Sequence, residues 1–277
     1  TDSTVEYAGE GLDTVETTIG IYALQANVEN LTFTDHATHG AGVGNMLDNV
    51  INGGDGIDDL YGRAGNDTLN GWGSANTLLG QEGDDVYFVV TAGDSVIEFA
   101  GQGNDTVRTT LSAFVLRDNV ENLIYAEELD YFSPGAFTGI GADNANSITG
   151  GSFDDFLSGL GGDDILFSKS GADILLGGAG ADQFRYAGGE AGIDRILDFT
   201  SGSDKIALST TGYTHTGVIG FIQGAGAGAT EAVSTFLYDT VTGIVSFDAD
   251  GNGAGAAVRI AQLNAGLSLS ATDFVFY

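Results

Sequence analysis

A large apolar residue recurs at every ninth position in two stretches of this chain, among polar residues and glycine. In frames of nine counted from Gly53 and from Gly150, the eighth position holds Leu60, Leu69, Leu78, Tyr87, Leu157, Leu166, Leu175 and Phe184. With one residue on either side, each forms the shortest strand that points one side chain inward and two outward. The pattern predicts short strands stacked around an apolar interior, and hence an all-β fold.

The first six positions of each frame have the composition of a tight turn. The frames read GGDGIDDLY, GRAGNDTLN, GWGSANTLL and GQEGDDVYF in the first stretch, and GGSFDDFLS, GLGGDDILF, SKSGADILL and GGAGADQFR in the second. Glycine allows the positive φ angles and the close backbone approach that such turns need. The sixth position holds Asp58, Asp67, Asn76, Asp85, Asp155, Asp164, Asp173 and Asp182. A weaker copy precedes each stretch, with Asn49 and Asn146 at this position.

The charge of the chain narrows its possible partners. It has 39 acidic residues against 8 lysines and arginines, for a formal net charge of -31. Such a surface repels nucleic acid and anionic membranes and attracts cations. A hydrophobic content of 42% argues against permanent disorder, although an unfolded state without cations is expected. The chain has no cysteine for disulfides and no apolar run of about eighteen residues that could span a bilayer.

The frame G-G-x-G-x-D-x-U-x, in which U is a large apolar residue, resembles the calcium-binding repeat of RTX proteins. The resemblance covers residues 44–88 and 141–186. It implies a right-handed parallel β-roll with two repeats per coil, in which each turn stacks on the second turn after it. Calcium takes about six to eight oxygen ligands, so one turn offers half a site and two stacked turns complete it.

The resemblance implies particular ligands. The stacked sixth-position pairs would be Asp58 with Asn76, Asp67 with Asp85, Asp155 with Asp173, and Asp164 with Asp182. Backbone carbonyls at the second and fourth positions would complete the shell, at Gly54, Gly56, Gly65, Gly83, Gly162, Gly171, Gly178 and Gly180. The flanking sequences GEGLDTV and GQGNDTV add Asp13 and Asp105 as candidates. We expect several calcium ions, at least about four.

Some frames depart from the motif. Ser74 and Asn76 replace glycine and aspartate in the third frame, and Phe153 replaces a turn glycine in the second stretch. Lys169 places a cation beside another turn. A site shared by Asp58 and Asn76 is therefore expected to be weaker or altered.

A longer repeat lies over the short one. The segment DSTVEYAGEGLDTVETT aligns with DSVIEFAGQGNDTVRTT at an offset of 92 residues, and NVENL occurs in both copies. We expect tandem units over residues 1–92 and 93–187 and an unrelated tail over 188–277. IYALQANVENLTF and AFVLRDNVENLIY are expected to be longer strands that continue the roll. The strand sequence VYFVVTA precedes the second copy and has no counterpart before the first. The chain is therefore expected to be the C-terminal part of a longer protein.

The tail resembles the segment that follows the β-roll in serralysin-type secreted proteins, through DRILDFTSGSDKIALS at residues 194–209. This resemblance implies an antiparallel cap over the end of the roll, which repeat proteins need. A hairpin is expected from strands at about 234–239 and 244–248. The turn DADGNG imitates an EF-hand loop, but Arg259 stands where the closing glutamate belongs, so a polar turn without metal is expected. The C-terminal ATDFVFY resembles an uncleaved type I secretion signal and also fits a final edge strand.

Catalytic motifs are absent from the sequence. The pair His36 and His39 lacks the glutamate of a zinc-protease helix, and its ability to bind metal is left open. The chain has no G-x-S-x-G elbow and no cysteine nucleophile. The repeat already accounts for most of its paired carboxylates.

The sequence therefore predicts a non-catalytic calcium-binding module that folds on export and carries the signal for the type I secretion machinery. It is expected outside a Gram-negative bacterium or on its surface. It is expected neither to bind nucleic acid nor to span a membrane. Two alternatives stay open. The chain could end a surface-layer or adhesin protein that binds cell-surface polysaccharide or other copies of itself. It could also end an exoenzyme, such as a protease, lipase or polysaccharide-modifying enzyme, with the catalyst upstream.

Overall fold

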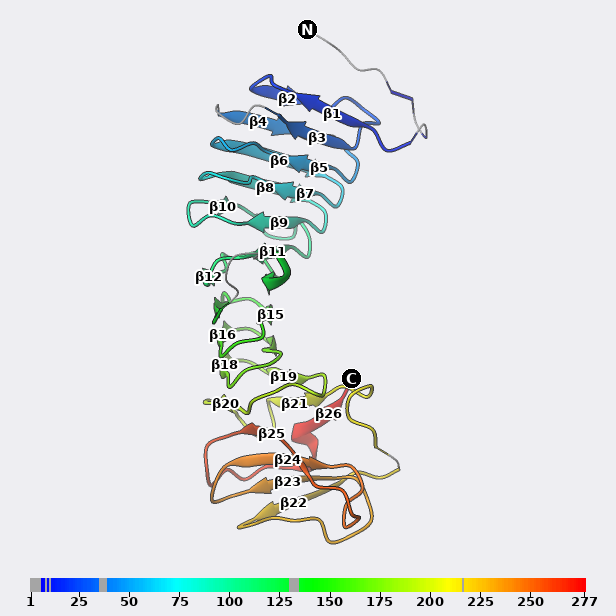
Figure 1. Cartoon of the computed structure of the whole chain (residues 1–277), viewed down its shortest axis with the longest axis vertical. Helices are drawn as coiled ribbons and strands as arrows, with labels where there is room; N and C mark the ends of the chain where they lie inside the picture. Colours follow the sequence, from blue (N-terminus) through cyan, green and yellow to red (C-terminus); the bar gives the residue numbers. More distant parts are fainter. Residues whose placement is uncertain (1–5, 8, 10, 35–38, 130–134, 216) are drawn as a thin grey trace. The chain divides into compact units, whose positions relative to one another are not determined.

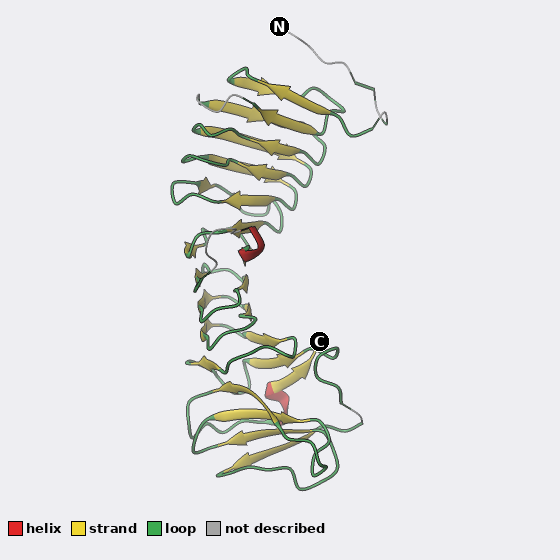
Figure 2. Cartoon of the chain, viewed as in Figure 1, coloured by secondary structure: helices red, strands yellow, loops and turns green. Residues whose placement is uncertain are grey.

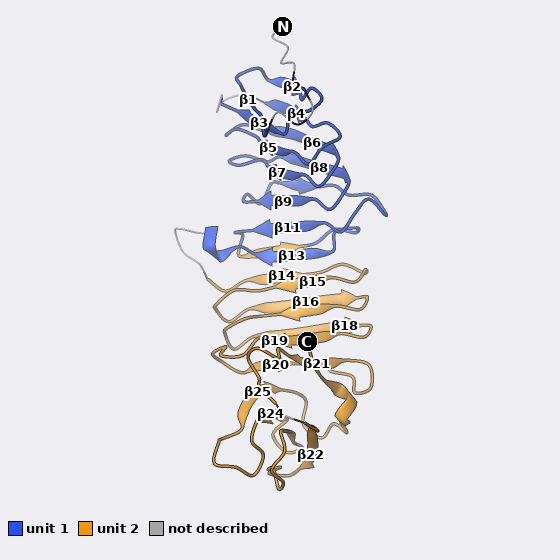
Figure 3. Ribbon diagram, turned by 90° about the vertical axis from the view of Figure 1, so that its right-hand side faces the viewer, with its two compact units in different colours: residues 1–111, 116–131 blue, residues 112–115, 132–277 orange. Residues whose placement is uncertain are grey.

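The computed structural model describes residues 6–7, 9, 11–34, 39–129, 135–215 and 217–277. These residues fold almost entirely as β-strands, turns and loops (Figure 2). The chain forms two compact units, one of residues 1–111 with 116–131 and one of residues 112–115 with 132–277 (Figure 3). The expected division at residues 92 and 187 follows the internal repeat and stays a prediction.

In the first unit the chain alternates between two stacks of parallel strands (Figure 1). One stack consists, in order, of β1 (Thr14–Thr17), β3 (Asn30–Phe33), β5 (Val50–Asn52), β7 (Thr68–Asn70), β9 (Val86–Val89), β11 (Thr106–Thr109) and β13 (Asn122–Tyr125). The other consists of β2 (Ile21–Ala23), β4 (Gly40–Val43), β6 (Asp58–Ala64), β8 (Thr77–Glu82) and β10 (Ser95–Val96). Leu60 pairs with Leu78, and Leu69 with Tyr87. Two repeats thus make one coil, which confirms the predicted parallel β-roll.

The second unit repeats this arrangement and adds the cap. One stack consists of the parallel strands β15 (Ser147–Thr149), β17 (Ile165–Phe167), β19 (Gln183–Tyr186), β21 (Lys205–Leu208) and β26 (Phe274–Phe276). The other begins with the parallel strands β12 (Ala113–Val115), β14 (Thr138–Ile140), β16 (Phe156–Gly161), β18 (Ile174–Ala179), β20 (Asp194–Ile196) and β25 (Val258–Gln262). It ends with β24 (Ile244–Asp248), β23 (Thr235–Asp239) and β22 (Gly220–Gly224).

The cap contains the predicted hairpin. Strands β23 and β24 pair antiparallel, β24 pairs antiparallel with β25, and β22 pairs parallel with β23. The C-terminal segment forms β26, which pairs with β21 and brings Phe274 and Phe276 against Phe236. Two short 3-10 helices, at Glu127–Leu129 and Ala271–Asp273, complete the described structure.

The interior of the roll is built from the eighth-position side chains. All eight are at most 1% exposed, while the residues beside them are half-buried, apart from the buried Ser158. The prediction of one inward side chain per repeat is confirmed. The expected long strands at residues 21–33 and 113–125 are wrong in one respect. A turn at the left-handed Asn27 (φ 67) divides the first into β2 and β3, and a turn at Asn119 (φ 66) divides the second into β12 and β13. Both halves of each continue the roll.

Candidate metal centre

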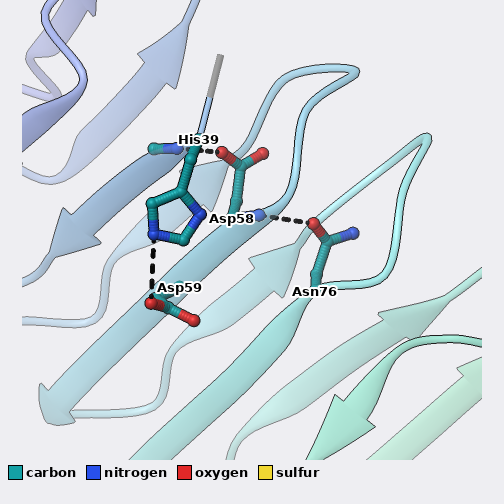
Figure 4. A network of polar contacts seen from close by, with 5 residues as sticks. His39, Asp58, Asp59 and Asn76 are labelled. Carbon is teal, nitrogen blue, oxygen red and sulfur yellow. Dashed lines mark hydrogen bonds and ion pairs between the residues drawn. The ribbon is translucent and has the colours of Figure 1, made fainter.

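The sixth-position side chains form ladders through the turns. In each predicted pair, one side-chain oxygen of the later residue, a carboxylate oxygen or the amide oxygen of Asn76, accepts a hydrogen bond from the backbone amide of its partner one coil earlier. The distances to the acceptor oxygen are 2.8 Å from Asp58 N to Asn76, 2.6 Å from Asp67 N to Asp85, 2.7 Å from Asp155 N to Asp173, and 2.9 Å from Asp164 N to Asp182. Figure 4 shows one rung, between Asp58 and Asn76. Stacking at a separation of 18 residues is confirmed.

The second carboxylate oxygen is the one that indicates a cation. In five aspartates this oxygen is buried and has no hydrogen-bond partner among the described residues: Asp67, Asp85, Asp164, Asp173 and Asp182. Burial raises the pKa of the first four of these carboxyls to about 7, and it also raises the pKa of Asp182. A buried anionic oxygen without a partner is costly unless a positive charge lies beside it. These residues therefore fit a hard cation.

The turns occur in two forms, which differ in the backbone conformation at the second position of the frame. In the closed turns, the second-position amide donates to the sixth-position side chain of the same turn. The donors and acceptors are Asn45 and Asn49, Gly54 and Asp58, Ala142 and Asn146, and Gly151 and Asp155, at 2.6 to 2.7 Å. None of these second-position residues has a positive φ. The carboxylates of Asp58 and Asp155 are thus satisfied by their own turns.

In the open turns, the second-position residue is left-handed. Its φ is 87° at Arg63, 56° at Trp72, 76° at Gln81, 74° at Leu160, 70° at Lys169 and 101° at Gly178. A residue other than glycine pays about 1–2 kcal/mol for this conformation, so the fold imposes it at five positions. The five aspartates with an unpartnered oxygen all lie in open turns. The backbone at the second position therefore decides whether a carboxylate is satisfied locally or left for an ion.

Asn76 reveals where that ion would lie. Its side-chain nitrogen donates to the carbonyl of Ser74 at 2.6 Å, to the carbonyl of Trp72 at 3.4 Å and to the Asp94 carboxylate at 3.0 Å. The second- and fourth-position carbonyls and a carboxylate of the next coil converge on one point, which an amide group occupies. The role of the predicted second- and fourth-position carbonyls as calcium ligands stays a prediction. The expected weakening of the Asp58–Asn76 site also stays a prediction.

Glycine at the first position makes room for the second oxygen. A Cβ at Gly62, Gly80, Gly159 or Gly177 would overlap the free carboxylate oxygen of the same turn. Ser168 is the exception, and its hydroxyl donates to Asp194 at 2.9 Å. At the fourth position, by contrast, glycine supplies the left-handed conformation, with φ of 103° at Gly65, 131° at Gly83, 100° at Gly162, 144° at Gly171 and 148° at Gly180. Gly56 does not adopt it.

The ladders extend beyond the regular frames. Asp105, a predicted candidate, accepts from the Asp85 amide at 2.8 Å, and burial raises its pKa to about 6. Asp194 and Asp204 accept in the same way from the amides of Asp173 and Asp182, both at 3.1 Å. Sequence reasoning missed these two because their separations of 21 and 22 residues break the ninefold period. Asp94, at a separation of 18 from Asn76, could have been found by extending the frame.

The remaining candidates are less closely joined to the ladders. Asp13 donates its amide to Glu29 at 2.9 Å, and one of its carboxylate oxygens is buried without a partner among the described residues. His39 lies 3.4 Å from the Asp59 carboxylate (Figure 4), whereas His36 lies outside the described residues. Metal binding by this histidine pair stays a prediction.

The tail turn DADGNG, residues 248–253, contains a local hydrogen bond to one of its own aspartates. In this turn Asp250 accepts from the Gly255 amide at 2.9 Å. Asp248 keeps one buried oxygen without a partner in the described chain. The expectation of a metal-free turn is not tested by these contacts.

Comparison with known proteins identifies the repeats. A family model described as RTX calcium-binding nonapeptide repeat (4 copies) matches residues 44–87, 140–175 and 164–196. The chain contains an RTX β-roll. The turns of the regular frames lie within the matched residues, and their first-position glycines and sixth-position aspartates are the motif's own residues, whereas Asp94, Asp105 and Asp204 lie outside the match.

Two curated relatives match shorter stretches. Both are from Rhizobium meliloti (strain 1021): the endo-1,3-1,4-beta-glycanase ExsH is 38% identical over 94 residues, and the endo-1,3-1,4-beta-glycanase EglC is 33% identical over 95 residues. These matches cover 34% and 33% of this chain and 18% of each relative. Among solved structures, the extracellular lipase LipA from Serratia marcescens aligns over 95% of this chain and 42% of its own, with 19% identity and a TM-score of 0.24.

Within the part of the chain that the structure describes, no helix has the length and apolar character needed to cross a membrane.

Proposed function

We propose that this chain is a non-catalytic region that binds several calcium ions and folds as they bind, outside the bacterial cell. The observation that carries the proposal is the set of buried carboxylate oxygens left without partners in the open turns. Calcium, a hard cation with oxygen ligands, suits carboxylates and carbonyls of this geometry. The residues proposed to bind it are the aspartates of the open turns, together with Asp105, Asp194 and Asp204.

Calcium would act as part of the folded structure. When free calcium exceeds a site's dissociation constant by about 100-fold, binding adds about 2.7 kcal/mol per site to stability. Several such sites supply free energy comparable to the whole stability of an ordinary domain, about 5–15 kcal/mol. An unfolded acidic chain could then pass the type I secretion channel and fold where calcium is abundant.

A calcium titration followed by circular dichroism tests this proposal. Protein stripped of metal at neutral pH should lack β structure, and calcium should restore it cooperatively. A β-rich spectrum that stays unchanged in excess chelator would contradict the proposal. Deleting residues 271–277 and measuring export separately tests the proposed secretion signal.

A second candidate is attachment to an exoenzyme. The matches to two glycanases favour it, because the matched stretch is a minor part of each relative and leaves most of its length for a catalytic domain. On this proposal the roll accompanies a polysaccharide-acting domain elsewhere in the same protein. The coding sequence upstream of Thr1 decides the matter, since further NVENL units there would instead favour a surface-layer or adhesin protein.

A further inference from the structure

Three buried carboxylates meet in the first unit at a place where the ninefold period ends. Asp85 closes the last regular turn, Glu98 follows β10, and Asp105 precedes β11. Each offers one oxygen, and these oxygens lie within 4.8 Å of one another. The side chains are 0%, 8% and 1% exposed, so the group is enclosed by the unit itself.

Two of the three carboxylates have an oxygen that no described residue satisfies. Asp85 Oδ2 and Glu98 Oε2 are buried without a hydrogen-bond partner among the described residues. Burial, together with the charges of Asp105 and Asp85, raises the pKa of Glu98 to about 8. Like charges enclosed together are costly, and removing that cost requires either protons or a cation.

Tyr87 holds Glu98 in place. This tyrosine occupies the inward eighth position, where the other repeats have leucine or phenylalanine. Its hydroxyl accepts from the Gly80 amide at 2.8 Å and donates to Glu98 Oε1. The hydroxyl thus fixes one oxygen of Glu98, while the other is the oxygen without a hydrogen-bond partner among the described residues.

We propose that Asp85, Glu98 and Asp105 bind one calcium ion in a three-carboxylate site, with Tyr87 as the positioning residue for Glu98. This inference rests on the proposed calcium-binding function and goes beyond it by assigning a ligand outside the nonapeptide repeats. Affinity for calcium rises with the number of charged ligands, so this site should fill before the turn sites, which have two carboxylates. Glu98 also lines a surface hollow, together with Ile97, Arg117 and Asp118.

The position of Glu98 recurs in the longer repeat. At the offset of 92 residues, Glu98 and Asp105 correspond to Glu6 and Asp13. The contacts also recur, because Asn119 donates to the Glu98 carbonyl at 3.3 Å and Asn27 donates to the Glu6 carbonyl at 3.0 Å. The placement of this glutamate therefore belongs to the repeated unit.

Calcium stoichiometry in the full chain tests the proposal. Glu98→Gln keeps the shape and the acceptor for Tyr87 but removes the charge. Glu82→Gln is the matched control, because Glu82 is an exposed residue of the same turn as Asp85. Asp164→Asn, in the second unit, reports separately on the turn sites. Circular dichroism at saturating calcium checks that each variant folds.

We expect Glu98→Gln to lose the tightest-binding step of the calcium titration, because two carboxylates remain where three were. Asp164→Asn should bind one ion fewer, and Glu82→Gln should match the wild type in both respects. An unchanged tightest-binding step in Glu98→Gln, beside a loss in Asp164→Asn, would overturn the three-carboxylate site and leave the proposed function intact. If no protein binds calcium, the proposed function itself fails.

Terbium gives a second readout that holds even if Glu98→Gln does not fold. Tb³⁺ replaces calcium and emits when a tyrosine close to it is excited. The first equivalent of Tb³⁺ added to wild-type protein should give tyrosine-sensitised emission, and Tyr87→Phe should lose most of it while still binding the ion. Equal emission from both proteins at the first equivalent would contradict the assignment.

Discussion

Acid should replace calcium in folding this chain. The perturbation is a change from pH 8 to pH 5 in protein freed of calcium. Unfolded aspartates titrate near 3.8, whereas in the folded chain burial raises the pKa of Asp67, Asp85, Asp164 and Asp173 to about 7. The folded state therefore binds more protons than the unfolded state between about pH 4 and 7.

The size of the effect follows from the pKa shifts. One pKa unit corresponds to about 1.4 kcal/mol, so keeping one of these carboxylates ionised in the calcium-free fold costs on the order of 4 kcal/mol. Four of them together cost about 16 kcal/mol, slightly more than a domain's whole stability of about 5–15 kcal/mol. The calcium-free fold has its full stability at pH values below about 3.8, the pKa of an unfolded aspartate. It loses that stability as the pH rises to about 7, the pKa of the buried aspartates. A return to pH 5 restores about 2–3 kcal/mol per group.

Far-ultraviolet circular dichroism of calcium-free protein across pH 5 to 8 measures this. The β signal should grow as pH falls, while protein saturated with calcium should keep its signal at pH 8. Because the sequence pI is about 4.1, light scattering must confirm that the acid form is not aggregated. Asp173→Asn should flatten the dependence by removing one titrating group.

A calcium-free β signal that is larger at pH 8 than at pH 5 would refute the reasoning. A signal independent of pH would also refute it, since the buried carboxylates would then not oppose folding.

Three further predictions concern the turns. Asn76→Asp should add one calcium ion per chain, because it replaces the amide group that occupies the convergence point with a ligand; unchanged stoichiometry in calorimetry would contradict this. Asp67→Asn should bind one ion fewer and lose about 2.7 kcal/mol of unfolding free energy at a calcium concentration about 100-fold above the dissociation constant. Asp58→Asn, in a closed turn, should keep the full number of ions. An equal loss of ions in both variants would show that closed turns also bind calcium. Magnesium at tenfold the calcium concentration should leave the chain mostly unfolded, because it needs near-ideal octahedral geometry at about 2.0–2.1 Å; equal folding by both ions would indicate charge screening alone.

The sequence by itself determined the roll and most of the ladder. One inward residue and one acidic turn residue recur every nine positions, from Leu60 and Asp58 onward, so a local period carries both the core and the stacking. Each coil contacts its neighbours through the same few positions, and the register follows once the period is known. The hairpin of β23 and β24 was also predictable, because a short polar turn separates two apolar runs.

Only the tertiary structure decided which turns are closed and which are open. Arg63 and Leu160 give no sign in the sequence of a left-handed backbone, since packing against adjacent coils imposes that conformation on side chains that disfavour it. The approach of Glu98 to Asp85 was equally hidden, because it depends on where an irregular segment passes and on the reach of Tyr87 across the interior. A period predicts contacts between equivalent positions, whereas these contacts join positions that no period relates.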